Sequence, residues 1–429
     1  MKIAFVSKNI SPEIGGRLAG YGPDDFSVTK RDDLYLTALA LNDGSKTCLI
    51  LGYDLLGIDA KYIRLIRSKC ADVIGGDEMQ VIVSCTHTHC GPHTRTLPSC
   101  SDRLETGYLE TLIDLTVGAT NELVNGEWFD TDVYFYSLNC DENVNRRHVG
   151  DDNRCTFLPH RPFLEPLCDG VRDRELGGLV FRDRTTGEIR YIIGNYAAHP
   201  LAGHTPGTGG HRISADYPGA FRNYLKAEIG CESMFLSGAA GDMVPKGHET
   251  GSAAIDEIGI KLAQAAIRGT ISAMRAPDSY KLGCETLQFG AAHATGRIRR
   301  CQKELPPDYR GLSEIEMEVQ LLSVGDVCLV GMPGEALTEL GLEIKWHSPF
   351  RKTFILYCST AYFNYICHGN ALTQGGYEAH NQYFDSRSGL ALVNAAVDGC
   401  HMLYERTFPD RSQWPENNYL PMVSFENRR

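Results

Sequence analysis

Short apolar runs alternate along this chain with longer stretches in which apolar residues recur at helical spacing. The runs at 32–41, 48–51 and 81–83 predict strands, and the periodic stretch 59–73 predicts a helix between the second and third of them. Asn42-Asp43-Gly44 predicts a turn, so the first two strands should form a hairpin. A strand, a helix and a further strand in this order are typical of a buried sheet in an α/β protein.

The same pattern continues over the rest of the chain and predicts one α/β unit with a mixed β-sheet core covered by helices. The segment at about 146–175 differs, since it has little periodicity, several prolines and many charges, and we expect a lid-like loop there. Further helices are expected at 104–124, 255–274, 336–346 and about 390–404, and further strands at 133–136, 179–181, 189–196, 233–236, 279–289, 315–322, 327–330 and 354–358.

The stretch QVIVSCTHTHCGPHT, residues 80–94, places histidines where a predicted strand ends. The run Val81-Ile82-Val83 favours a buried strand, and Gly91-Pro92 cannot continue one. Side chains of an extended segment face the same way at every second residue, so His87 and His89 should address one ion or one substrate. The alternative is a polar loop in which histidines occur by chance.

Three more polar residues follow apolar strands, and the ends of strands are where α/β sheets commonly place their sites. They are His199, Glu335 and Tyr365. Two imidazoles and a carboxylate are a common catalytic zinc set, and zinc lowers the pKa of a bound water to near 7. Each residue also has a structural interpretation: His199 could cap a strand, Glu335 could be the acid that opens helix 336–346, and Tyr365 could belong to the core.

Composition narrows the class of protein. The chain has 42 basic and 54 acidic residues, a formal net charge of −12, and no basic run that would hold a phosphate backbone, so we expect no nucleic-acid partner. No apolar run approaches the roughly 20 residues that span a bilayer. The apolar residues 3–6 are too few for a signal sequence, and we expect a cytoplasmic protein without a transmembrane segment.

The 15 cysteines include no Cys-x-x-Cys pair, and several lie within apolar strand patterns. This distribution predicts reduced thiols in the core, which agrees with a reducing compartment. A cysteine nucleophile at Cys85 or Cys90 is an alternative, although nothing in the sequence indicates a lowered thiol pKa there.

Several short motifs are spread over nearly the whole chain. They are His87-Thr88-His89, His199-Pro200, Gly241-Asp242 and Pro333-Gly334-Glu335, together with 18–22, 32–56, Asn145-Arg146, Tyr365 and Tyr377-Glu378-Ala379. In their order and spacing they resemble the amino-terminal catalytic region of the neutral/alkaline, non-lysosomal ceramidase family.

The resemblance implies a Zn²⁺ ion bound by His87, His199, Glu335 and Tyr365. It also implies that His89 carries a proton to the leaving group, while Arg146 and Tyr377 steady substrate oxygens. An arginine at the end of a strand, as Arg146 is, would otherwise be interpreted as a solvated surface group.

The chain also departs from that family. The active-site serine of the family is replaced by Val244, and Cys90-Gly91-Pro92-His93 stands where the family has a small residue and Gly-Pro-Gly. The carboxy-terminal β-sandwich of the family is absent, so residues 1–429 are expected to form a single ceramidase-like catalytic domain. No apolar stretch is an obvious site for a sphingoid chain, which weakens the expectation of a lipid substrate.

The sequence therefore predicts a zinc-dependent hydrolase that cleaves the amide C–N bond of a small or medium acyl compound by means of metal-activated water. A zinc-dependent esterase or lactonase would use the same residues, because both reactions pass through a tetrahedral oxyanion. A non-catalytic metal-binding protein is the second alternative. The expected partner is a small-molecule acyl substrate, and association into a homo-oligomer is left open.

Overall fold

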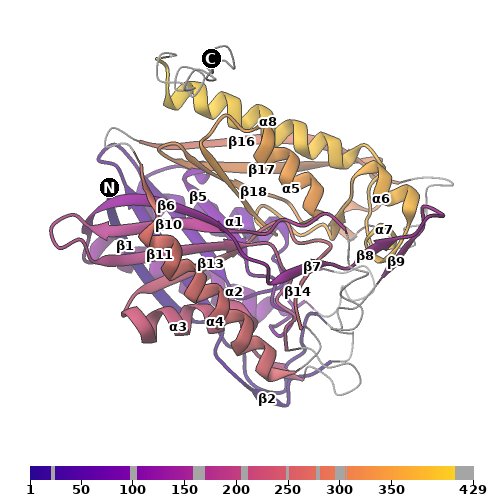
Figure 1. Cartoon of the computed structure of the whole chain (residues 1–429), viewed down its shortest axis with the longest axis horizontal. Coiled ribbons are helices and arrows are strands. Elements are labelled where there is room, and N and C mark those ends of the chain that lie inside the picture. Colours follow the sequence, from indigo (N-terminus) through magenta and orange to yellow (C-terminus); the bar gives the residue numbers. More distant parts are fainter. Residues whose placement is uncertain are drawn as a thin grey trace, which may run out of the picture.

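Two β-sheets pack face to face, and helices cover the outer face of each (Figure 1). This computed structural model describes residues 1–20, 25–96, 104–157, 170–203, 211–247, 251–276, 281–294, 305 and 307–410. The layers run from helices α1 to α4, through a larger and a smaller sheet, to helices α5 and α8. The predicted α/β fold with a mixed sheet core covered by helices is thereby confirmed.

The larger sheet has the order β13-β11-β10-β6-β1-β3-β4-β5, with β15 (Met274–Arg275) also pairing with β6. The pairs β4/β5 and β11/β13 are parallel and the other neighbours are antiparallel, so the sheet is mixed. Its strands are β1 (Lys2–Asn9), β3 (Tyr35–Asn42), β4 (Thr47–Tyr53), β5 (Val81–Cys85), β6 (Phe129–Asn139), β10 (Glu175–Asp183), β11 (Ile189–Tyr196) and β13 (Glu232–Ser237).

The smaller sheet has the order β16-β17-β18-β20, and short strand pairs connect the layers near the ends of both sheets. The strands of the smaller sheet are β16 (Leu282–Ala292), β17 (Glu314–Val324), β18 (Val327–Gly331) and β20 (Lys352–Leu356). The short strands are β2 (Thr29–Lys30), β7 (Asn143–Asn145), β8 (Arg147–Val149), β9 (Cys155–Phe157), β12 (Arg212–Ile213), β14 (Met243–Pro245), β19 (Glu335–Ala336) and β21 (Tyr365–Ile366).

The helices divide between the two outer faces. Helices α1 to α4 lie on the larger sheet, and α8, with α5, covers the smaller one. They are α1 (Ala60–Ile74), α2 (Thr106–Asn125), α3 (Asp216–Ile229), α4 (Ser252–Ile271), α5 (Thr338–His347), α6 (Gly369–Gln374), α7 (Tyr377–His380) and α8 (Ser388–Thr407). In the described residues, no helix is both long enough and apolar enough to cross a bilayer.

The alternation of side chains along the strands explains why the runs read as almost continuously apolar. In β3, Leu36, Ala38 and Ala40 pack under the helices, whereas Leu39 and Leu41 face the smaller sheet. Both faces of the strand are therefore shielded from water, and both carry mainly apolar side chains. The hairpin β3/β4 and the parallel connection β4–α1–β5 form as the sequence predicts.

Two predicted elements need correction. Helix α5 begins at Thr338, so Glu335 does not open it but lies in the short strand β19. Within the expected loop at 146–175, strands β8 and β9 form an antiparallel hairpin. Residues 158–169 of that segment lie outside the described part of the chain, and its role as a lid stays a prediction.

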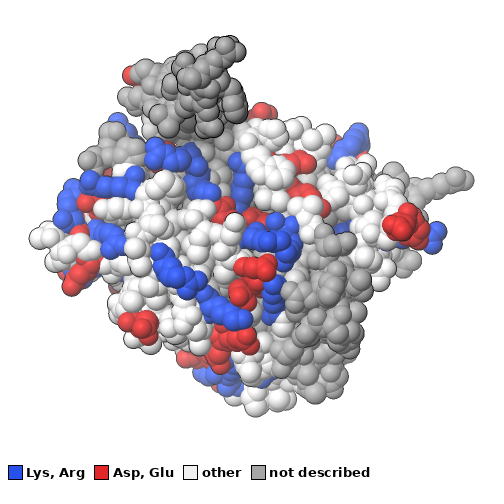
Figure 2. All heavy atoms as spheres, viewed as in Figure 1, with Lys and Arg blue, Asp and Glu red and all other residues white. Residues whose placement is uncertain are grey.

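Charged side chains of both signs are interspersed on the face seen in Figure 2. Ion pairs account for part of this mixture, as where Arg184 and Arg275 both contact Asp132. The described cysteines form no disulfide with one another, and all of them except Cys155 are buried. The predicted placement of the cysteines in the core is confirmed for this part of the chain, and their reduced state stays a prediction.

Candidate metal centre and active site

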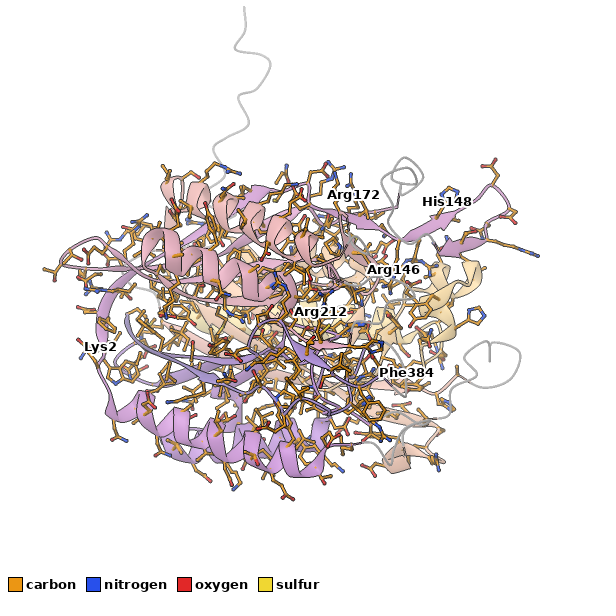
Figure 3. The ribbon with its side chains drawn as sticks, turned by 90° about the horizontal axis from the view of Figure 1, so that it is seen from below. Lys2, Arg146, His148, Arg172, Arg212 and Phe384 are labelled. Atoms are coloured by element: carbon orange, nitrogen blue, oxygen red, sulfur yellow. The ribbon has the colours of Figure 1, made fainter. Side chains whose placement is uncertain are left out.

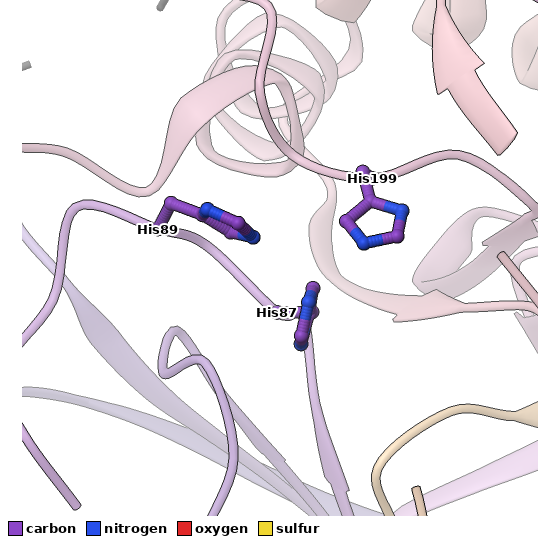
Figure 4. A group of neighbouring side chains, drawn as sticks. All are labelled: His87, His89 and His199. Carbon is purple, nitrogen blue, oxygen red and sulfur yellow. The ribbon is translucent and has the colours of Figure 1, made fainter. Parts of the chain in front are cut away.

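Three imidazoles from two distant segments meet at one end of the larger sheet (Figure 4). His87 and His89 follow β5, and His199 follows β11. The ring centroid of His87 lies 5.1 Å from that of His89 and 4.8 Å from that of His199. One nitrogen of each ring lies within 4.8 Å of the others, which is close enough for the three to share one ion.

The two histidines of the His-Thr-His motif are neighbours for a different reason from the one predicted. Strand β5 ends at Cys85, and His87 has a left-handed backbone conformation, with φ of 72°. The alternation of an extended segment therefore does not operate here. The amide of His87 donates to the carbonyl of Leu55 at 2.9 Å, and this bond helps to hold the unusual backbone. Such strain in a residue other than glycine is concentrated at functional sites.

Hydrogen bonds to the main chain fix the tautomers of His87 and His199. Nδ1 of His87 lies 2.7 Å from the carbonyl oxygen of Leu56, and Nδ1 of His199 lies 3.0 Å from that of Met243. Because a carbonyl oxygen can only accept, each Nδ1 carries a proton, and in the neutral form of each ring Nε2 then carries the lone pair. This arrangement is the usual one for histidines that bind a metal through Nε2.

Glu335 lies between these two lone pairs. Its Oε2 is 3.2 Å from Nε2 of His199 and 3.6 Å from Nε2 of His87. The hydroxyl of Tyr357 donates to Oε2 at 2.9 Å, and the hydroxyl of Tyr362 donates to Oε1. The carboxylate is 2 % exposed, so its charge is held by these groups and not by bulk water.

Burial and neighbouring groups keep the imidazole of His87 neutral and the carboxylate of Glu335 ionised. Burial lowers the pKa of His87 to about 3, an effect that Glu335 only partly offsets. Burial acts to raise the pKa of Glu335, but His87, His199 and the Tyr362 hydroxyl hold that pKa well below its usual range. Neutral imidazoles and an ionised carboxylate are the forms that bind a metal.

The donor set fits a divalent cation. Two Nε2 lone pairs and a carboxylate oxygen face one another, and with the tautomers described above no proton lies between them. A cation is the group that would make this convergence favourable, and nitrogen with oxygen ligands are typical of zinc. The structure identifies no particular metal, and the residues are consistent with the predicted ion.

Tyr365 is placed beside Glu335 by the backbone. The parallel pairing of β19 with β21 makes these two residues direct partners, and Tyr365 is 6 % exposed. Its hydroxyl accepts a hydrogen bond of 3.0 Å from Nη2 of Arg146. Arg146, labelled in Figure 3, is itself held by Glu378, at 2.7 Å from Nε to Oε1. Glu378 also pairs with Arg147, so one carboxylate contacts two buried cations.

A small cavity of ≈ 60 Å³ opens onto this group. Tyr377, which is 49 % exposed, lies at its edge with its ring centroid 5.7 Å from that of Tyr365. His199 reaches the cavity through Glu335, and Arg146 reaches it through Tyr365. The structure thus gathers all seven predicted site residues, while the role of each stays a prediction. The lining residues are Gly20, Leu56, His87, His89, Arg95, Glu335, Tyr362, Asn364, Tyr365, Tyr377 and Asn381.

Several residues of the site have no obvious signal in the sequence. Tyr357 and Tyr362, which hold Glu335, lie at and beyond the end of strand β20 among other apolar and aromatic residues. Arg95 follows the histidine motif by six residues, yet it lines the same cavity. Gly20, in the motif at 18–22, also lines the cavity, and a Cβ there would lie 2.1 Å from Cβ of His89.

Two other sequence features have no place at the cavity. Val244, at the position of the ceramidase serine, packs with Val144 and Leu201 and is fully buried. It is not among the residues that line the cavity. Burial raises the pKa of the Cys85 thiol, and nearby Asp54 raises it further, so this cysteine lacks the thiolate that a nucleophile requires.

Comparison with known proteins identifies the fold. No family model matches the sequence, and no curated protein matches it. This chain is similar in structure to neutral ceramidase from Pseudomonas aeruginosa, with a TM-score of 0.77 and 16 % sequence identity. The similarity covers 94 % of this chain and 74 % of the ceramidase chain. It is also similar to the structure of a ceramidase complexed with C2, with a TM-score of 0.76 and 15 % sequence identity, over 94 % of this chain and 75 % of that chain. The chain therefore has a neutral ceramidase-like fold, as the sequence resemblance implies.

Proposed function

We propose that this chain is a zinc-dependent hydrolase that cleaves the amide C–N bond of a small or medium acyl compound. The observation that supports it best is the approach of two Nε2 lone pairs to the buried carboxylate of Glu335. The neutral ceramidase-like fold supports an amide as the bond cleaved, since the solved structures of similar fold are ceramidases.

In this proposal His87, His199, Glu335 and Tyr365 hold the zinc ion. Bound zinc would supply a Lewis acid that lowers the pKa of a water and polarises the acyl oxygen. An alternative ligand set consists of His87, His89 and His199, whose nitrogens lie within 4.8 Å of one another. We favour the first set because it uses the lone pairs and the carboxylate that face each other, and because it leaves His89 for proton transfer.

His89 would accept a proton from the attacking water and return it to the leaving nitrogen. Burial, together with His87 and His199, lowers the pKa of His89 well below its usual value, so its imidazole is neutral and can accept. The position of Gly20 supports this role, because the glycine allows the loop to pack directly on His89 and orient the ring.

Tyr377 and Arg146 would steady the substrate oxygens. The carbon Cζ of Arg146 lies 5.5 Å from the ring centroid of Tyr377, and its Nη2 donates to Tyr365. Tyr377 is half exposed at the cavity and would meet the substrate first. The charge of Arg146 is partly balanced by Glu378, so it orients these hydroxyls without repelling a divalent ion strongly.

Two measurements test the proposal. Zinc should be present at one ion per chain in the purified protein, and matched amides, esters and lactones of the same acyl group should show amides among the substrates cleaved. Cleavage of esters or lactones alone would make the protein an esterase or lactonase with the same site. Bound zinc without any turnover that depends on His89 would indicate a metal-binding protein instead.

A further inference from the structure

Arg95 is a buried cation in the wall of the proposed active site. It is 7 % exposed and lines the same cavity as His87, Glu335 and Tyr377. Arg95 belongs to none of the sequence motifs and is not one of the proposed metal ligands.

Of the three guanidinium nitrogens of Arg95, only Nη2 makes a hydrogen bond among the described residues. Nη2 donates to the carbonyl oxygen of Ala19 at 3.2 Å, and Cζ lies 4.4 Å from the ring centroid of Tyr362. Tyr362 in turn donates to Glu335, so Arg95 lies one residue away from the proposed zinc ligand. The stacking on Tyr362 and the bond to Ala19 together hold the group in place.

Nε and Nη1 of Arg95 have no hydrogen-bond partner among the residues that the structure describes. Together these two nitrogens carry three N–H bonds. Arg146, a second buried arginine close to the site, differs in this respect, since Oε1 of Glu378 accepts from its Nε. A buried charge with unfilled donors is unfavourable in a folded protein, and when it lies in a cavity wall a ligand is the natural group to fill them.

We propose that Arg95 binds a carboxylate of the substrate, so that the preferred substrates are acyl compounds that carry a carboxylate close to the scissile amide. Planar guanidinium groups match the geometry of oxyanions. The cavity is small, at ≈ 60 Å³, and a carboxylate is the smallest of the oxyanions that a guanidinium group binds in this way. This inference rests on the proposed function, since it names the substrate class of the same site.

The test compares substrates that differ only in charge. One pair is an N-acetyl amino acid and its carboxamide, in which the carboxylate lies on the amine side of the scissile bond. The other pair is a dicarboxylic acid monoamide and the corresponding diamide, in which it lies on the acyl side. For at least one pair, the zinc-loaded native protein should prefer the carboxylate by about a hundredfold or more in kcat/KM, because an analogue without the charge leaves the arginine unpaired.

The variants separate a binding role from a structural one. Arg95→Gln should reduce this preference to near one, mainly by raising KM for the carboxylate substrate, while zinc content stays at one ion per chain. Arg95→Lys should keep part of the preference, because it keeps the charge. Arg190→Gln, which removes an equal charge at a hairpin remote from the cavity, should change nothing.

Equal loss of activity toward charged and uncharged substrates in Arg95→Gln, or no preference in the native protein, would overturn the inference and leave the amidase proposal standing. If no amide is hydrolysed at all, the proposed function fails, and calorimetry decides about Arg95 separately. The N-acetyl amino acid or the monoamide should then bind native protein at least tenfold more tightly than Arg95→Gln, and equal binding to both proteins would refute the inference.

Discussion

Glu335 and Tyr365 are direct partners across the two-residue parallel pairing of β19 with β21. Glu335 follows β18 and Tyr365 follows β20, which are themselves parallel neighbours in the smaller sheet. The pairing keeps the parallel direction of those strands, although Glu335 lies four residues beyond the end of β18 and Tyr365 nine residues beyond the end of β20, and it brings a carboxylate and a phenol to one side of the cavity. The three histidines come from the larger sheet, so the proposed metal centre lies where the two sheets meet.

Replacing the carboxylate should remove the metal. In Glu335→Gln we expect zinc affinity to fall by about one to two orders of magnitude or more, because a charged ligand becomes neutral among the same neighbours. Metal analysis after dialysis against a weak chelator measures this. Val244→Ser is the control, since Val244 packs away from the cavity, and it should keep its zinc. Full zinc and full activity in Glu335→Gln would contradict the ligand assignment.

His89 distinguishes the two ligand sets. If His89 only transfers protons, His89→Ala should keep its zinc and lose about 10²-fold or more in kcat. The readouts are zinc per chain and turnover of one amide, measured on the same preparation. Loss of zinc in His89→Ala, to the same extent as in His87→Ala, would instead favour the set of three histidines.

A methyl group on Gly20 should disturb the position of His89. A Cβ at Gly20 would lie 2.1 Å from Cβ of His89, whereas a Cβ at Gly16 in the same loop would meet nothing closer than 3.5 Å. We therefore expect Gly20→Ala to lower kcat by about tenfold or more and Gly16→Ala to leave it nearly unchanged. Equal activities in the two variants would show that the loop does not position His89.

Acid should weaken the protein through Glu175. Its Oε2 lies 3.0 Å from Nζ of Lys345, and Lys352 pairs with its Oε1. Burial acts to raise the pKa of Glu175, but the two lysines lower it to about 2. Because the folded-state pKa is below the unfolded value, the stabilisation is complete above about pH 4.5 and is lost as the pH falls toward 2.

The shift corresponds to about 3 kcal/mol of unfolding free energy. The difference in unfolding free energy between native protein and Glu175→Gln, obtained from urea titrations, should therefore narrow as the pH is lowered from 6 to 3. Glu122→Gln removes an exposed partner of Lys8 and should differ little from native at any pH. If the difference in unfolding free energy between native protein and Glu175→Gln stayed constant from pH 6 to 3, the lowered pKa of Glu175 would be refuted.

The sequence predicts most of the elements because burial on both faces leaves its mark in apolar runs, as in β3, β4 and β5. The order of the strands within each sheet is harder to predict from the sequence, since pairings such as β1 with β6 join residues far apart in the chain. The boundary at Glu335 was wrong because a two-residue strand carries no periodicity, and the Pro-Gly turn before it also suits the start of a helix.

The site residues could be named from the resemblance, but their supporting contacts could not. The left-handed backbone of His87 depends on the main chain of β4 and its following loop, which no local pattern reveals. From the sequence, Tyr357 and Tyr362 would be assigned to the apolar core. In the structure, the hydroxyls of both donate to Glu335. Arg95 lies in a segment of mixed composition, and only its burial in the cavity wall distinguishes it from a surface arginine.

The central claim is that His87, His199, Glu335 and Tyr365 surround one zinc ion. Anomalous diffraction from crystals of the native protein, recorded on both sides of the zinc absorption edge, tests it without any substitution. We expect a single peak within about 2.0–2.2 Å of Nε2 of both histidines and of the Glu335 carboxylate. A zinc-supplemented crystal without a peak among these atoms, or with its peak at another place in the chain, would contradict the account.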